Sequence, residues 1–243
     1  MASEFDEQDR ERLRRQYSEI ATLAGGLAHE IRNPLSTIRL NLNLLSEELE
    51  HGDNPRDRRM LNKLVTIQRE CRRLEGILDA FLQFARVGEL RLVPADLNAI
   101  VQDFMAFVRP EVEQQGIELS PHLDADLPRV RLDESLMRQV LVNLVRNASQ
   151  AMPDGGLIEL QTSCDGEQVC LAIIDNGIGM DERTRSRMFQ AFFSTHPGGS
   201  GLGLPTVRKI VEAHGGRIDC ESEPARGTRF SIHLPVAAPP VLS

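Results

Sequence analysis

Two long amphipathic segments at the start of the chain constrain its fold most. In the first segment, apolar residues from Ile20 to Leu49 recur at steps of three and four. The second segment does the same from Met60 to Ala85, and the sequence HGDNP at 51–55 separates the two. This spacing places the apolar side chains on one face of each helix. We therefore predict a helical hairpin with a short turn at 51–55.

One such hairpin exposes its apolar stripe and cannot bury it alone. Two hairpins can bury their stripes together by packing into a four-helix bundle. We therefore predict a homodimer that forms through residues 10–87.

The sequence pattern changes once, near residue 90. After a short strand in RLVPADL, helical periodicity covers residues 97–114, 134–152 and 204–214. Alternating strands are read from GIELSPHL, RVRLD, LIELQTSC, QVCLAIID, RIDCES and TRFSIHL, whereas 176–203 reads as glycine-rich and irregular. This order predicts an α+β fold in which helices cover one sheet. We expect a hairpin domain over 1–90, an α/β sandwich over 91–236 and a flexible tail over 237–243.

Composition excludes several classes of protein. The net charge of −8 argues against direct nucleic-acid binding, which requires clustered Lys and Arg. The sequence contains no run of 18 apolar residues, so we expect no membrane segment. The first residues lack the apolar core of a signal peptide. The four cysteines form no C-x-x-C pair, so we expect reduced core thiols rather than a zinc site. The predicted location is the cytoplasm.

His29 lies off the apolar stripe of the first helix. It is two residues from both Leu27 and Ile31, about 200° around the helix from each, so we expect it to face solvent. Glu30 is adjacent and can accept a proton from the imidazole, which leaves the other ring nitrogen nucleophilic. By itself, this pattern also describes an ordinary surface histidine.

Two further residues follow His29 on the same helix. Asn33 lies one turn later on the same face and can orient a water molecule. Pro34 removes a backbone N–H and clashes with the carbonyl of Glu30, which predicts a bend just after the histidine.

Three patches in the second domain have the chemistry of a nucleotide site. Asn143 and Asn147 lie one turn apart on a predicted helix, and their amide oxygens can complete a Mg²⁺ shell. Asp175 ends a predicted strand and can accept a hydrogen bond from an adenine amine, while Gly177 and Gly179 permit close backbone approach. The sequence GGSGLGL (198–204) opens a helix and offers N–H groups to phosphates, but it fits neither a Walker A nor a Rossmann motif.

Taken together and in this order, the motifs resemble those of two-component sensor histidine kinases. HEIRNPL is similar to the phospho-acceptor H-box, NLVRNASQA to the N-box and DNGIGM to the G1 box. MFQAFFST is similar to the F-box, GGSGLGL to the G2 box, and GTRFSIHLP to the closing strand of the ATP-binding domain. Among the subgroups of this family, the residues of these motifs are most similar to those of the nitrogen-regulation type. The resemblance implies a kinase that uses ATP and Mg²⁺ and passes its phosphoryl group to a response regulator.

The resemblance also implies roles for the residues at matching positions. His29 accepts the γ-phosphoryl group, Glu30 is the base, and Asn33 serves the reverse phosphatase reaction. Asn147, assisted by Asn143, holds Mg²⁺. Asp175 reads adenine, and 181–200 forms a lid that Phe189, Phe192 and Phe193 anchor. The other nucleotide-binding residues are expected to be Gly177, Gly179, Met180, Phe192, Ser194, Thr195, His196, Gly199, Ser200, Gly201, Leu202, Gly203, Leu204 and Thr228.

Some positions depart from the family pattern. Gln150 and His196 stand where relatives often carry a basic residue, and Arg146, Arg208 and Lys209 are candidates to compensate. About 20 residues precede the H-box helix, which leaves no room for a sensor domain. We therefore expect either an excised core or a short kinase with a separate input protein.

The sequence leaves two alternative functions open. The first is an ATP-hydrolysing relative, as in gyrase-type and chaperone ATPases, which place a glutamate at the first N-box position. Asn143 occupies that position here and cannot act as a base, which favours transfer to histidine over hydrolysis. The second is a non-catalytic dimeric scaffold that binds ATP, against which His29, Glu30 and Asn147 argue.

Overall fold

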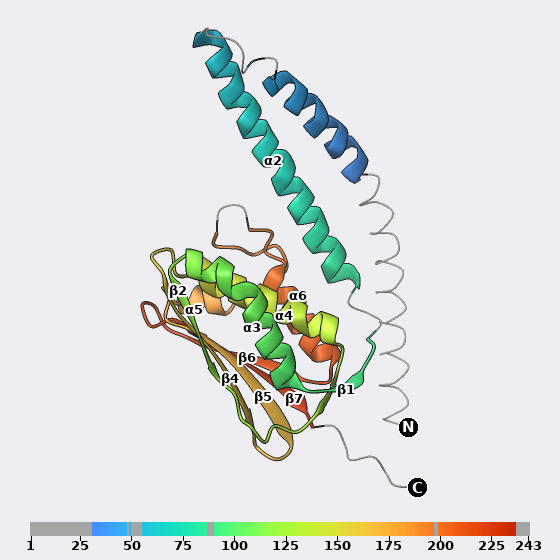
Figure 1. Cartoon of the computed structure of the whole chain (residues 1–243), viewed down its shortest axis with the longest axis vertical. Helices are drawn as coiled ribbons and strands as arrows, with labels where there is room; N and C mark the ends of the chain where they lie inside the picture. Colours follow the sequence, from blue (N-terminus) through green and yellow to red (C-terminus); the bar gives the residue numbers. More distant parts are fainter. Residues whose placement is uncertain (1–30, 48, 50–54, 87–89, 197–198, 237–243) are drawn as a thin grey trace. The chain divides into compact units, whose positions relative to one another are not determined.

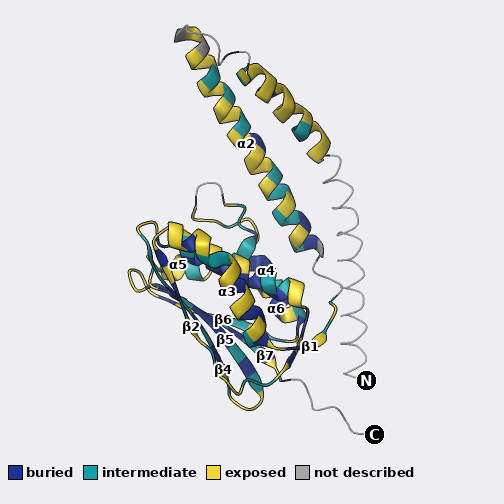
Figure 2. Ribbon diagram, viewed as in Figure 1, coloured by how far each residue is buried: buried dark blue, intermediate teal, exposed yellow. Residues whose placement is uncertain are grey.

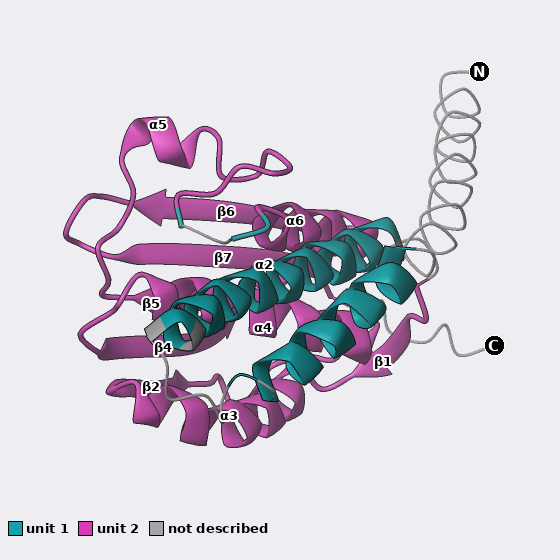
Figure 3. Cartoon of the chain, turned by 90° about the horizontal axis from the view of Figure 1, so that it is seen from above, with its two compact units in different colours: residues 1–88, 196–200 teal, residues 89–195, 201–243 magenta. Residues whose placement is uncertain are grey.

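The computed structural model describes residues 31–47, 49, 55–86, 90–196 and 199–236 (Figure 1). The chain divides into two compact units (Figure 3). The first comprises residues 1–88 with 196–200, and the second comprises 89–195 with 201–243. No helix in these described ranges is long and apolar enough to cross a membrane.

The first unit contains the predicted hairpin. A helix through residues 31–47 and 49 lies beside α2 (Pro55–Arg86) in Figure 1. Leu35 and Leu42 of the first helix form a buried cluster with Cys71 of α2. Such a buried contact fixes the two helices side by side. The hairpin is thus confirmed for the described residues.

Ion pairs set the register of the hairpin. Arg32 pairs with Asp79 at 2.6 Å, and Arg39 pairs with Glu75 at 3.1 Å. Moving forward along the first helix therefore means moving backward along α2, so the two helices are antiparallel.

Only part of the apolar stripe of the hairpin is buried inside the unit. Leu35 and Leu42 are buried, but Ile38 between them is 45% exposed. On α2, Cys71 is buried whereas Ile67, one turn earlier, is 46% exposed (Figure 2). Six of the exposed apolar residues recur every seven positions: Ile31, Ile38 and Leu45 on the first helix and Met60, Ile67 and Leu74 on α2. Leu40, Leu44 and Val65 are exposed outside this repeat.

The second unit is built on a five-stranded sheet with the strand order β2-β4-β5-β7-β6. β2 and β4 pair in parallel, and the other neighbours pair antiparallel. A separate two-stranded ribbon pairs β1 with β3. The strands are β1 (Val93–Ala95), β2 (Ile117–His122), β3 (Val130–Leu132), β4 (Gly156–Cys164), β5 (Gln168–Asp175), β6 (Arg217–Ser222) and β7 (Thr228–Pro235).

Three helices cover one face of this sheet: α3 (Leu97–Gln114), α4 (Glu134–Gln150) and α6 (Gly203–Ala213) (Figure 1). The core lies between the two layers because the strands alternate buried and half-exposed residues. Leu160 and Ile232 of the sheet and Val140 and Ile210 of the helices are fully buried. The predicted α+β sandwich is confirmed.

The ends of α4 show how the sequence fixes this helix. Asp133 is the N-cap, and its carboxylate accepts hydrogen bonds from the backbone N–H groups of Ser135 and Leu136 at 3.0 and 3.2 Å. The helix ends at Gln150, two residues before the predicted end. Gly155 follows with a φ of 85°, and a Cβ there would lie 2.5 Å from the carbonyl oxygen of Gly116. Glycine is therefore required where the chain turns into β4.

Candidate nucleotide site

The residues of the N-box and the G2 box come together at one end of the helical layer. Asn143 and Asn147 lie on successive turns of α4, as predicted. Gly203 begins α6 beside them, and a Cβ built on it would lie 3.4 Å from Oδ1 of Asn143. A glycine at this point lets the backbone at the start of α6 approach the N-box helix.

Asn147 holds a buried polar atom that the protein leaves unpaired within the described residues. Its Nδ2 atom is buried and has no hydrogen-bond partner in the described part of the chain. A buried amide without a partner costs about 1–3 kcal/mol, so native proteins rarely keep one without a reason. The amide is thus available to a ligand that enters beside α4.

The donor set suits Mg²⁺ bound together with phosphates. Among the described residues, no group of three His, Cys, Asp or Glu side chains forms a complete metal site. Mg²⁺ usually keeps several waters and takes substrate phosphates with one or two protein oxygens, which the amides of Asn143 and Asn147 can supply. The residues present therefore fit this metal.

Asp175 lies at the end of β5 and is only 6% exposed. Burial raises the pKa of its carboxyl group, and hydrogen bonds from the backbone N–H groups of Gly177 and Thr228 act in the opposite direction. The bond from Gly177 to Oδ1 is 3.0 Å long. The backbone thus holds one carboxylate oxygen in place, which fixes the orientation of the group.

The loop after Asp175 packs tightly against its neighbours. The N–H of Ile178 donates to the carbonyl of Ala151, the C-cap of α4, at 3.0 Å. A Cβ on Gly177 would lie 2.6 Å from that same carbonyl oxygen. Gly179 has a φ of 64°, and its Cβ would lie 2.0 Å from the carbonyl oxygen of Glu223. Both glycines are required by close backbone approach, as the motif predicted.

Ser222, which the sequence analysis did not select, joins this loop to β7. Its hydroxyl accepts a hydrogen bond from the N–H of Met180 at 2.8 Å and lies 2.9 Å from the carbonyl of Gly227 and 3.0 Å from the hydroxyl of Thr228. Ser222 lies in a strand with no motif around it. Only the pairing of β6 with β7 brings it to the site.

The lid region contains one short helix, α5 (Glu182–Arg185), where the sequence predicted none. Asp181 caps it, and the carboxylate accepts from the N–H of Thr184 at 2.7 Å. After α5, Arg187 lies 4.3 Å from the ring centre of Phe193.

The three lid phenylalanines do not behave alike. Phe189 and Phe193 are half-buried. Phe192 is 65% exposed and has a φ of 64°, so the expectation that it anchors the lid is wrong. Its backbone N–H donates to the carbonyl of Gly201 at 3.0 Å. A Cβ on Gly201 would lie 2.5 Å from the carbonyl carbon of Phe192, so the main chain at this point, rather than the ring, fills the space.

The other predicted nucleotide-binding residues fall into three groups by exposure. Leu202 and Thr228 are buried, Met180, Ser200 and Leu204 are half-buried, and Ser194, Thr195, His196 and Gly199 are exposed. In the first unit, Asn33 is exposed. His29, Glu30 and the expected bend at the carbonyl of Glu30 lie outside the described residues.

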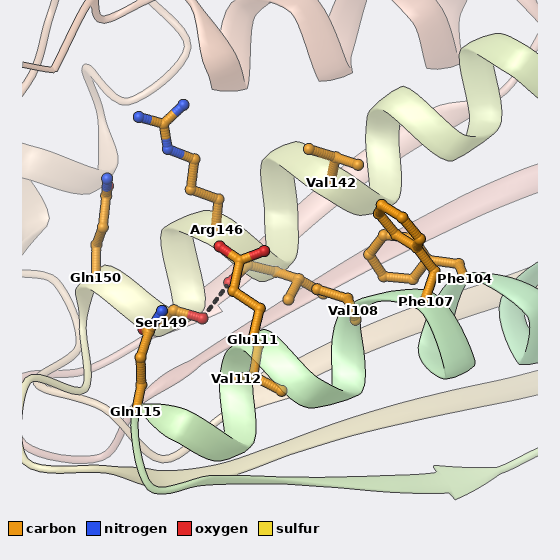
Figure 4. Close-up of a pocket in the computed structure, with 11 residues that line it drawn as sticks. Phe104, Phe107, Val108, Glu111, Val112, Gln115, Val142, Arg146, Ser149 and Gln150 are labelled. Atoms are coloured by element: carbon orange, nitrogen blue, oxygen red, sulfur yellow. Dashed lines mark hydrogen bonds between the residues drawn. The ribbon is translucent and has the colours of Figure 1, made fainter.

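The three cations expected to compensate for Gln150 and His196 differ in their surroundings. Arg208 pairs with Glu212 at 2.7 Å, so its charge is partly neutralised. Burial lowers the pKa of Lys209. Arg146 lines a groove of about 310 Å³ between α3 and α4 (Figure 4).

Two families of known domains match this chain. Residues 19–90 match the His Kinase A (phospho-acceptor) domain. Residues 132–238 match the histidine kinase-, DNA gyrase B- and HSP90-like ATPase family. The chain belongs to the two-component histidine kinases. In this histidine kinase, the phospho-acceptor match covers the hairpin, and the ATPase match covers all the nucleotide motifs.

Curated histidine kinases align with most of the chain. It is 34% identical over 215 residues to the sensor histidine kinase ZraS of Klebsiella oxytoca, an alignment that covers 88% of this chain and 46% of ZraS. It is 33% identical over 218 residues to sporulation kinase E of Bacillus subtilis, covering 89% of this chain and 29% of that kinase. The chain thus spans less than half the length of these relatives.

Solved histidine kinases share the fold. Full-length ShkA in complex with AMPPNP superposes with a TM-score of 0.69 at 29% identity, covering 90% of this chain and 47% of ShkA. ThkA in complex with the response regulator protein TrrA gives a TM-score of 0.66 at 27% identity, covering 95% of this chain and 66% of ThkA.

Proposed function

We propose that this histidine kinase uses ATP to phosphorylate its own His29 and then transfers the phosphoryl group to an aspartate of a response regulator. The observation that carries the proposal is the buried, unpartnered amide of Asn147, one turn of α4 after Asn143, whose own amide lies beside Gly203 at the start of α6. Two amides on α4 close to the N-terminus of α6 suit a phosphate and its counterion.

Each part of the site then has a role. Asp175 accepts a hydrogen bond from the adenine amine, and the backbone N–H groups near Gly201 and Gly203 contact phosphate oxygens. Asn147, with help from Asn143, would hold Mg²⁺, which would supply positive charge to neutralise the phosphates. Asn143 cannot act as a base for water, which favours phosphoryl transfer over hydrolysis. Glu30 takes the proton from His29 as the ring attacks phosphorus.

The proposed assembly is a homodimer with separate functional regions. Residues 1–90 dimerise and carry the phospho-acceptor, and 91–236 bind ATP. Ile38 and Ile67 belong to the part of the apolar stripe that stays exposed in one hairpin. This exposed apolar face supports dimerisation, because a second hairpin can cover it. The complex of ThkA with a response regulator supports a receiver domain as the partner. The nitrogen-regulation subgroup and a separate input protein complete the proposal.

Labelling with γ-³²P-ATP and Mg²⁺ tests the kinase reaction. We expect a label that is stable in base and lost in acid, as for phosphohistidine. His29→Gln should abolish the label, whereas His122→Gln, at an exposed position of β2, should retain it. Label on His29→Gln would show that the acceptor assignment is wrong.

Asn33 is proposed to orient water in the reverse reaction on the phosphorylated partner. Asn33→Ala should slow dephosphorylation of the partner more than it slows autophosphorylation. An equal loss of both activities would contradict a separate role for this exposed side chain.

A further inference from the structure

His214 is a buried histidine that connects two helices. It ends α6 and is only 5% exposed. Its Nε2 atom accepts a hydrogen bond from the backbone N–H of Asp133 at 2.9 Å, and its Nδ1 atom lies 2.7 Å from the carbonyl oxygen of Ile210. Since Nε2 accepts, the ring is neutral with its proton on Nδ1. The imidazole therefore uses both of its nitrogens in the interior.

Asp133 extends this connection to the first residues of the second unit. Its Oδ2 atom accepts from the backbone N–H of Arg91 at 3.0 Å, while Oδ1 accepts from the backbone N–H and the hydroxyl of Ser135. Asp133 is itself only 8% exposed. One residue thus binds the N-terminus of α4, the C-terminus of α6 and the chain that enters the second unit.

On each of these two helices, the residues of the proposed nucleotide site lie several turns away from the His214–Asp133 contact. Asn143 lies ten residues beyond Asp133 on α4, which is about 15 Å along a helix. Gly203 lies at the opposite end of α6 from His214. The His214–Asp133 contact thus joins α4 to α6 at the end of α6 that lies away from Gly203.

We propose that His214 is a positioning residue for nucleotide binding: its neutral imidazole holds α4 and α6 in the arrangement that binds ATP. The inference rests on the proposed kinase function and deepens it. It predicts that ATP affinity, and not only stability, depends on the hydrogen bond between Asp133 and His214.

Protonation of the ring opposes this arrangement. A proton on Nε2 would face the N–H of Asp133, so the acceptor would be lost. Burial lowers the pKa of His214, while the carbonyl of Ile210 and the carboxylate of Asp133 act in the opposite direction. Among the described residues, Asp133 is the charged group whose field acts on the ring.

Two substitutions of His214 separate positioning from stability. His214→Leu fills the space but leaves the N–H of Asp133 unpaired, so the dissociation constant for ATP should rise at least about fivefold. His214→Gln can accept from Asp133 through Oε1 and donate through Nε2 without titrating, so it should bind ATP nearly as the parent does. His122→Leu, at an exposed position of β2, serves as the matched control.

The measurement is the affinity for trinitrophenyl-ATP between about pH 7.5 and about pH 5.5, with circular dichroism to show that each variant is folded. Because burial lowers the pKa of His214, the parent should match His214→Gln down to about pH 6.5 and lose affinity relative to it only at lower pH, since the two share every other titrating group. Equal pH profiles for the two proteins would overturn the proposal, even if His214→Leu does not fold. Failure of the parent itself to bind the nucleotide would instead contradict the proposed function.

Discussion

Ser222 and Thr228 face each other across the last β-hairpin, and their hydroxyl oxygens lie 3.0 Å apart. The same Ser222 hydroxyl accepts from the N–H of Met180, in the loop that follows Asp175. One buried side chain therefore fixes the position of the loop proposed to bind the nucleotide relative to the start of β7.

Ser222→Ala should weaken both stability and ATP binding. The N–H of Met180 would lose its partner, which costs about 1–3 kcal/mol of unfolding free energy. The loop would also lose its fixed position, so the dissociation constant for ATP should rise. Chemical denaturation and calorimetric titration measure the two effects. Ser163→Ala, at an exposed position of β4, should change neither; lower stability with unchanged affinity for Ser222→Ala would assign the hydroxyl to the hairpin alone.

Asn147→Ala should separate function from stability. The amide contributes no hydrogen bond through Nδ2 in the described structure, so its removal should change the unfolding free energy by less than about 1 kcal/mol. Autophosphorylation should fall at least about tenfold, because a metal and phosphate ligand is lost. Asn176→Ala offers the contrast: its Oδ1 accepts from the N–H of Leu157 at 2.9 Å, so stability should fall there. Full kinase activity in Asn147→Ala would exclude the amide from the site.

Asp175→Asn should be at least as stable as the parent at neutral pH. Burial raises the pKa of Asp175, so the folded state keeps its proton at a pH where the unfolded chain has lost it. The contribution of this group to stability is then present below the unfolded value of about 3.9 and is lost as pH rises through the folded pKa. The amide does not titrate and avoids this loss. Thermal unfolding at several pH values tests the expectation.

The same substitution should reduce ATP affinity at least about tenfold, since a hydrogen bond to a charged acceptor contributes about 1.5–3 kcal/mol. Asp126→Asn, at an exposed position, is the control for the change of charge. Unchanged affinity in Asp175→Asn would rule out recognition of adenine by this carboxylate.

Ile67→Glu should prevent dimerisation without unfolding the hairpin. Ile67 is 46% exposed within one chain, so a charge there is harmless until a second hairpin buries it. Sedimentation equilibrium should show a dimer for the parent and a monomer for this variant. Thr66→Glu adds the same charge one residue earlier on the exposed surface of α2 and should remain dimeric. A monomeric parent, or a dimeric Ile67→Glu, would contradict the proposed interface.

The sequence predicted the elements because their signals are local. Steps of three and four residues indicated α2 and α4, and alternation indicated β5 and β7. Their types are confirmed, and the bounds of β5 agree at both ends, whereas α4 ends two residues before the predicted end and β7 one residue after it. The glycine motif also predicted that the backbone approaches its neighbours closely at Gly177 and Gly179, because only glycine lacks the Cβ that would prevent such an approach. The short α5 was missed because a single turn of helix has too few residues to show a period.

Tertiary structure decided which of these residues act on one another. Ser222 reaches the loop of Met180 only through the register of β6 with β7, and His214 reaches Asp133 only because α6 packs beside α4. The steps of three and four residues likewise predicted one apolar stripe on the first helix. The packing of the two helices buries Leu35 and leaves Ile38 exposed. The periodicity of apolar residues along a chain indicates on which face of its helix or strand a residue lies. Hydrogen bonds between residues far apart depend on how those faces are brought together, and that is settled by the packing of the whole sheet and its helices.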